Sequence, residues 1–180
     1  MDTRSGVEEG VSTAVGTDSK PREATDADLP TIIRHRRGMF REMGFCDEAA
    51  LDAMEATSIP FILAGLKDGS YRGWLLERDG RVVAGGGLMV VGYPSAPHDP
   101  NPRRAWILNM YTEPEYRRKG LAKAIVEAMV SWCCAQGFGW VSLHATDAGR
   151  HLYETLGFEP TNEMHLLLTN DAREGSRAFR

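Results

Sequence analysis

The sequence predicts one α/β (α+β) domain, built on a mixed, mostly antiparallel central sheet that is flanked by helices. Three observations lead to this prediction. Two stretches with helical spacing of apolar residues come first. Two strand-like runs joined by a tight-turn signal follow. An apolar strand, a strongly amphipathic helix and a short strand then follow in βαβ order. A chain of 180 residues fits one such domain with tails better than two domains.

The first part of the domain is expected to be helical after a short strand at residues 22–25. Apolar residues keep helical spacing over residues 29–43, and Gly44 follows as a C-cap. A second helical stretch is expected over residues 47–69, with a bend near Pro60.

The pattern then changes to strands. Residues 71–77 and 81–91 are strand-like, and the Arg-Asp-Gly turn at residues 78–80 predicts that they form a hairpin. Three consecutive glycines, residues 85–87, stand in the second strand. Glycine inside a strand is typical of a bulge or of close approach by another backbone.

The second half predicts the βαβ unit. Residues 92–104 hold four prolines and are expected to form a loop, and residues 105–112 are apolar almost throughout, as in a central strand. The strongest helix starts at Leu121, and a short strand is expected at residues 141–145.

A last helix over residues 148–156, ended by Gly157, and a last strand over residues 164–168 complete the domain. The expected element order is β-α-α-β-β-β-α-β-α-β over residues 21–169. Residues 1–20 are polar and rich in Gly, Ser and Thr, so a disordered N-terminal tail is expected there, and a flexible C-terminal tail is expected at residues 170–180.

Composition narrows the classes of function. The net charge is −4 and the pI about 5.7, so the chain has no broad electrostatic reason to bind nucleic acid or an anionic membrane. No apolar stretch approaches the roughly 20 residues that span a bilayer. Three cysteines without metal-type spacing do not form a disulfide framework, so a cytoplasmic protein without a metal is expected.

The segment with chemical content lies where the apolar strand passes into the strongest helix. Arg117, Arg118 and Lys119 precede Gly120, and small residues there let an anion approach the backbone. A helix N-terminus presents unpaired N–H groups and the positive end of the helix dipole. These features predict a pyrophosphate site; the alternative is a solvated basic turn that caps an ordinary helix.

Two motifs resemble those of the GNAT superfamily of N-acetyltransferases. Arg117-x-x-Gly120-x-Ala122 is similar to the acetyl-CoA motif of that family, and the Leu-Tyr-Glu-Thr-Leu-Gly-Phe run at residues 152–158 is similar to a second family signature. The element order from residue 22 to 168 also follows the GNAT fold. The resemblance covers about 80% of the chain and implies the GNAT fold and acetyl-CoA as co-substrate, without a metal.

The resemblance also implies roles for individual residues. The pantetheine arm would pair with the backbone of Met110, Tyr111 and Thr112 as an extra strand. Backbone amides from Arg117 to Ala122, Leu121 included, would hold the pyrophosphate. Thr146 stands where the family often has a cofactor-binding Asn. Tyr153 would protonate the departing thiolate as an amine attacks the thioester directly in a ternary complex. The amine is expected to be that of a small molecule, and a peptide N-terminus or a lysine is the alternative.

Several points stay open at this level. Glu113, Asn109 (through a water) and His144 are candidates for the general base, and a water chain is an alternative to all three. The basic run at residues 34–37 either attracts an acidic substrate or forms a solvated helix face, and the second interpretation is favoured. A non-catalytic acetyl-CoA sensor is the alternative function, although it has no need of Tyr153. A homodimer is expected from the family resemblance.

Overall fold

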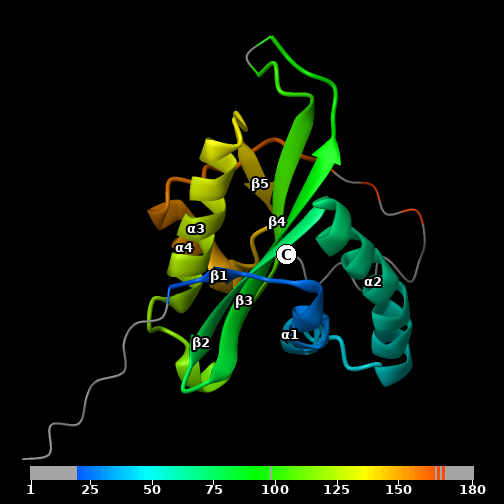
Figure 1. Cartoon of the computed structure of the whole chain (residues 1–180). Helices are drawn as coiled ribbons and strands as arrows, with labels where there is room; N and C mark the ends of the chain where they lie inside the picture. Colours follow the sequence, from blue (N-terminus) through cyan, green and yellow to red (C-terminus); the bar gives the residue numbers. More distant parts are fainter. Residues whose placement is uncertain (1–19, 98, 165, 167, 169–180) are drawn as a thin grey trace, which may run out of the picture.

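The computed structural model describes residues 20–97, 99–164, 166 and 168, so the two predicted tails lie, apart from residue 20, outside the described residues. The elements in chain order are β1 (Arg22–Glu23), η1 (Asp26–Asp28), α1 (Leu29–Glu42), α2 (Glu48–Asp68), β2 (Tyr71–Arg78), β3 (Arg81–Gly92), β4 (Arg103–Thr112), η2 (Pro114–Tyr116), α3 (Leu121–Ala135), β5 (Val141–Leu143) and α4 (Asp147–Thr155). Figure 1 shows them on the chain. The predicted order is confirmed as far as α4.

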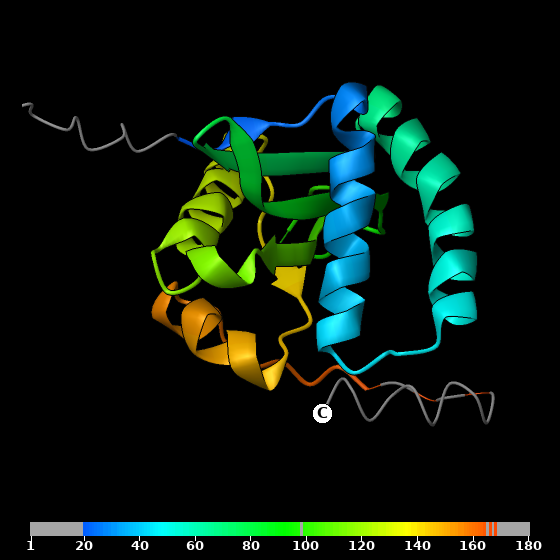
Figure 2. The same cartoon turned by 90° about the horizontal axis from the view of Figure 1, so that it is seen from below.

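The five strands lie in the sheet in sequence order. Pairing is antiparallel from β1 to β4, and β5 runs parallel to β4. Helices α1 and α2 lie on one face of the sheet, and α3 and α4 lie on the other (Figures 1 and 2). The prediction of a mixed, mostly antiparallel sheet flanked by helices is confirmed.

Alternation along β2 divides the core between the two faces, as expected for a strand covered on both sides. Trp74 and Leu76 pack in the larger cluster, together with Ile125 and Met129 of α3. Tyr71 lies in the smaller cluster under α1 and α2. Both faces of the sheet are therefore packed against helices, so the strand ends that lie between the helices are held in place.

Local sequence signals set the ends of α1 and α2. The Asp47 carboxylate accepts hydrogen bonds from the backbone N–H groups of residues 49 and 50, as an N-cap does. Gly44 and Gly69 follow the two helices at positive φ (94° and 80°), the left-handed conformation typical of a C-cap glycine. α2 runs through Pro60 as one helix.

α2 is also long and apolar enough to cross a membrane, judged by length and composition alone, so the expectation that no stretch meets this criterion is wrong. One such helix is weak evidence, because core helices of soluble proteins meet the same criterion; those helices are mostly buried, whereas the apolar window of α2 is 17% buried. α2 packs on the rest of the domain through Leu51, Ile62 and Gly65, which are buried.

A bulge lies in the β3–β4 pair, opposite the three glycines. Gly85 pairs with Tyr111 and Gly87 with Leu108, so two residues of β4 stand opposite Gly86. One of these is Asn109, which has a φ of 55°. The glycine run thus predicts the bulge, while the extra residue belongs to the partner strand.

Several elements differ from the sequence prediction: β1 ends at Glu23 and β5 at Leu143, each two residues earlier than expected. β4 starts within the expected loop at Arg103, because Gly92 and Val91 extend β3 and pair with residues 103 and 104. The strand expected over residues 164–168 is absent from the described part of it. Met164, Leu166 and Leu168 belong to no strand and are 92%, 79% and 86% exposed, so their alternation has no sheet partner there.

Candidate functional site

The candidate site opens where β4 and β5 part. β5 pairs with β4 over three residues, up to Ile107 with Leu143, and β4 then continues alone on that side to Thr112. A cavity of about 1270 Å³ lies at this opening, between α1, β4, the start of α3, and α4. Typical pockets for one ligand enclose about 300–1,000 Å³, so this cavity has room for two substrates.

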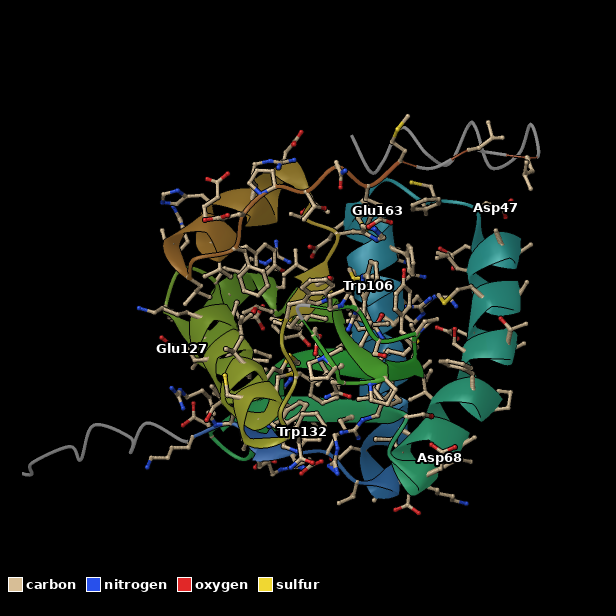
Figure 3. All side chains as sticks on the ribbon, turned by 90° about the horizontal axis from the view of Figure 1, so that it is seen from above. Asp47, Asp68, Trp106, Glu127, Trp132 and Glu163 are labelled. Atoms are coloured by element: carbon tan, nitrogen blue, oxygen red, sulfur yellow. The ribbon has the colours of Figure 1, made fainter. Side chains whose placement is uncertain are left out.

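Figure 3 places Trp106, a lining residue on β4, near the middle of the molecule. Glu127 of α3 lies on one flank, and Asp47 and Asp68 at the ends of α2 lie on the other. The cavity is therefore central, between the two helical layers.

Most residues that the sequence predicted for the site line this cavity. They are Asn109, Met110, Tyr111, Thr112, Arg117, Arg118, Gly120, Leu121, Ala122, His144, Thr146 and Tyr153. Glu113 and Lys119 do not line it.

The turn before α3 has the backbone of an anion site. Arg118 and Gly120 adopt positive φ (57° and 79°), and α3 begins at Leu121. Within residues 20–97 and 99–164, no group accepts a hydrogen bond from the backbone N–H groups of residues 118–123. A row of unpaired donors at the positive end of a helix dipole binds anions, as phosphate sites at other helix N-termini do.

The three basic side chains of this turn have different surroundings. Arg117 donates from Nε to the backbone oxygen of Thr112 at 2.9 Å and from Nη2 to the Glu42 carboxylate, so it fastens the turn to β4 and α1. The Lys119 ammonium lies over the ring of Tyr116. Arg118 lines the cavity and has no ion pair with another described residue, which leaves its charge for a ligand.

Tyr153 lines the cavity from α4, and its ring packs against Phe158. Burial raises the pKa of its phenol above the ordinary value of 10, so the hydroxyl keeps its proton at neutral pH. No described residue hydrogen-bonds this hydroxyl. Tyr153 is therefore a protonated phenol at the wall of the cavity.

Asn109 is held by the protein itself. Its Oδ1 accepts a hydrogen bond from Arg36 Nη1, and its Nδ2 donates to the Tyr71 hydroxyl at 3.1 Å. Both ends of the amide are thus engaged, and the residue is 6% exposed. These bonds fix the bulge, which is a different task from accepting a proton.

Glu113 lies outside the cavity, in a charged cluster at the end of β4. Its carboxylate pairs with Arg34, and it lies 3.4 Å from Arg81 and 3.8 Å from the His35 ring. Burial raises the pKa of Glu113, but the hydrogen bond and charge of Arg34 and the charges of His35 and Arg81 lower it further, so the net pKa is below the ordinary value. A carboxylate stabilised in this way is a poor base.

His144 differs from Glu113 because it lines the cavity. Its ring packs on Trp106 with centroids 5.2 Å apart, and its Nε2 lies 3.1 Å from a carboxylate oxygen of Glu163. Of the three residues named as bases, His144 has a titratable group at the cavity wall. Thr146, the N-terminal cap residue of α4, lies beside it on the same wall.

Sequence reasoning missed Arg36, which lines the cavity from α1. The charges at residues 34–37 favour a solvated face, but in the structure Arg36 is partly buried. The signal was present: Arg36 lies four residues after Ile32 and four before Phe40, on the apolar stripe of the helix.

The comparisons with known proteins agree with this geometry. Residues 34–158 match the model of the Acetyltransferase (GNAT) family. The GCN5-related N-acetyltransferase of Ralstonia eutropha JMP134 is 37% identical with a TM-score of 0.77, over 83% of this chain and 97% of that one. A predicted acetyltransferase of Clostridium acetobutylicum solved with acetyl-CoA shares the fold at 22% identity, with a TM-score of 0.73 over 82% and 94% of the two chains.

Two curated relatives match over shorter stretches. The ribosomal protein bS18-alanine N-acetyltransferase of Escherichia coli (strain K12) is 34% identical over 39% of this chain and 50% of its own length. Human N-acetyltransferase 8 is 27% identical over 50% of this chain and 39% of its own length. The chain thus spans half or less of these relatives. By the family match and the Ralstonia relative, the chain belongs to the GNAT acetyltransferase family.

Proposed function

We propose that this protein transfers the acetyl group of acetyl-CoA to a primary amine of a small molecule, by direct attack in a ternary complex. One observation carries the proposal above the others. Unpaired N–H groups of residue 118 and residues 120–123 border the same cavity as the phenol of Tyr153, which supports a site for the pyrophosphate joined to a site for the leaving thiolate.

Acetyl-CoA is held by backbone groups of this chain in the proposed complex. The pyrophosphate binds at the start of α3, and the Arg118 charge adds to the attraction. The pantetheine arm lies along β4 from Met110 to Thr112, on the side that β5 leaves open. Amide groups of the arm then pair with the strand as a further strand does.

In the transfer step the amine nitrogen attacks the thioester carbonyl carbon. A C–N bond forms, the C–S bond breaks, and the Tyr153 hydroxyl gives its proton to the departing thiolate. A thiol titrates near ~8.5, and burial raises the pKa of Tyr153 above the ordinary tyrosine value of ~10, so the proton transfer itself is uphill in free energy and is completed as the C–S bond breaks. Backbone N–H groups of β4 beside the bulge polarise the carbonyl oxygen.

The amine must lose a proton before or during the attack. We assign this proton to water in the cavity and to His144, whose ring faces the cavity beside Glu163. Glu113 takes no part, since it lies outside the cavity in its ion-pair cluster.

The test is binding of acetyl-CoA to wild type and to two variants of Gly120, measured as the shift of the unfolding midpoint. Gly120→Glu places a carboxylate in the anion site. Gly120→Gln is the matched control, because it has the same size and suffers the same strain at a φ of 79° without the charge. Ligand at 100 times its Kd adds about 2.7 kcal/mol to the free energy of unfolding of wild type.

We expect the shift to be large in wild type, smaller in Gly120→Gln and absent in Gly120→Glu. Equal shifts in the two variants would refute the phosphate assignment. Binding in wild type without acetylation of any primary amine would favour the sensor function instead. Cytoplasmic location, a homodimer, and independence of metal, nucleic acid and membrane remain predictions from the sequence.

A further inference from the structure

The basic run of α1 separates into residues with different partners. Arg34 pairs with the Glu113 carboxylate. Arg37 lies within 3.1 Å of three carboxylates on α2, those of Glu48, Asp52 and Glu55. Arg36, between them, makes no ion pair with any residue in the described ranges, so its charge has no counterpart there.

Neutral groups surround the Arg36 side chain. Nη1 donates to the Asn109 side-chain oxygen, and Nε lies 3.2 Å from both Ser58 Oγ and Met54 Sδ. The guanidinium also lies 4.9 Å from the centre of the Phe40 ring. Burial lowers the pKa of Arg36 below its ordinary value, which shows how far the site withdraws the charge from water. A desolvated charge with no opposite charge is an expensive arrangement to keep without a use.

One part of the guanidinium remains open. Nη2 has no hydrogen-bond partner among the described residues. It also keeps some exposure to solvent, because the one described side-chain nitrogen or oxygen that is both sealed from solvent and unpaired is Nδ1 of His35. Arg36 lines the cavity, together with Met39 and Met43 one and two turns further along α1. The free N–H groups are therefore within reach of a molecule in the cavity.

The place of Arg36 favours a ligand group other than the pyrophosphate. Asn109, its partner on β4, is three residues from Thr112, about 10 Å along an extended strand. Glu42, which Arg117 joins to the anion turn, is six residues further along α1, about 9 Å along a helix. Arg36 thus contacts β4 at the bulge, where the acetyl group lies in the proposed complex, while Arg117 of the anion turn contacts β4 and α1 about 9–10 Å further along each element.

We propose that Arg36 recognises an anionic group, a carboxylate or a phosphate, carried by the amine substrate itself. The inference rests on the proposed function and deepens it, since it defines the acceptor class as small amines that bear a negative charge. The planar guanidinium suits either anion, because its parallel N–H groups match two oxygens at once.

The test measures binding of amines to the protein saturated with CoA, by calorimetry, so that no turnover is needed. The probes are linear amino acids with one to four methylene groups between amine and carboxylate, each with its carboxamide as the uncharged match. 2-Aminoethyl phosphate tests whether the anionic group of the substrate is a phosphate. We expect wild type to prefer the anionic member of a pair by about 10- to 100-fold.

Arg36→Gln is expected to remove this preference, and Arg36→Lys to keep part of it. Arg37→Gln is the matched control, because it removes the neighbouring charge and leaves the preference in place. No preference in wild type, no binding of any probe to the CoA complex, or a preference that survives Arg36→Gln would each overturn the inference.

An equal loss of affinity for charged and uncharged probes in Arg36→Gln would also overturn it, since Arg36 would then act through the bulge at Asn109 alone. Failure of acetyl-CoA binding itself is seen separately in the Gly120 experiment. The two proposals can therefore fail independently.

Discussion

Gly87 on β3 leaves room for the side chain that supports the bulge. A Cβ at this position would overlap the Tyr71 hydroxyl and lie 2.6 Å from its Cζ. The Tyr71 ring is buried under α1 and α2, and its hydroxyl accepts the hydrogen bond from Asn109. Gly87→Ala must therefore displace Tyr71 and break that bond.

The expected loss follows from these contacts. Overpacking a core site costs about 1–3 kcal/mol, and the hydrogen bond adds about 1 kcal/mol. The free energy of unfolding should fall by about 2–4 kcal/mol, which lowers the unfolding midpoint by roughly 5–15 °C for a domain of this size. Acetyl-CoA should also bind more weakly, because the bulge beside Met110 loses its support.

Urea unfolding and calorimetric titration with acetyl-CoA measure the two effects. Gly92→Ala is the matched control on the same strand: a Cβ there has no neighbour within 4 Å, so the variant should keep or slightly raise stability. Equal stability of the Gly87→Ala and Gly92→Ala variants would refute the packing argument.

Three further predictions concern other parts of the domain. Burial lowers the pKa of His35 to about 4, so the folded state is most stable above pH 6.5, where the histidine is neutral in both states, and loses stability as the pH falls toward 4. Urea unfolding between pH 7.5 and 5 should therefore show a smaller fall in the free energy of unfolding for His35→Gln than for wild type, and equal falls would contradict this. Arg118→Gly should raise stability by up to about 1 kcal/mol, by relieving a φ of 57°, and should weaken acetyl-CoA binding; a less stable variant would contradict the strain. Asp99→Ala should lower the free energy of unfolding by about 3–5 kcal/mol, because it leaves Arg104 without its ion-pair partner in a buried site. Adding Arg104→Met to this variant should restore part of the stability, and no recovery in the double variant would argue against the ion pair as the cause.

Much of the fold follows from local signals in the sequence. The spacing of apolar residues predicts α1 to α4, and glycines mark helix ends and the hairpin turn. At that turn Asp79 and Gly80 both have positive φ, as a tight hairpin requires. The glycine run in β3 predicts a bulge or a close approach. The structure shows why glycine is needed there, because a Cβ at Gly86 would meet Met110 and one at Gly87 would meet Tyr71.

What the sequence could not show depends on contacts between distant residues. Glu113 was a candidate base because it follows the cofactor strand, yet Arg34, 79 residues away, draws it into an ion pair. The different roles of Arg36 and Arg37 likewise depend on which side chains of α2 and β4 face each one. The alternation of Met164, Leu166 and Leu168 resembles a strand, but a strand also needs a neighbour to pair with.

The central claim is that Tyr153 donates a proton during acetyl transfer, and turnover by Tyr153→Phe tests it most directly. The assay follows CoA release at saturating acetyl-CoA with a primary amine, and acetyl-CoA binding by calorimetry is the control for folding. The account predicts unchanged acetyl-CoA affinity with kcat lowered by about 10²- to 10⁴-fold. An unchanged kcat, or no turnover by wild type with any primary amine, would contradict it.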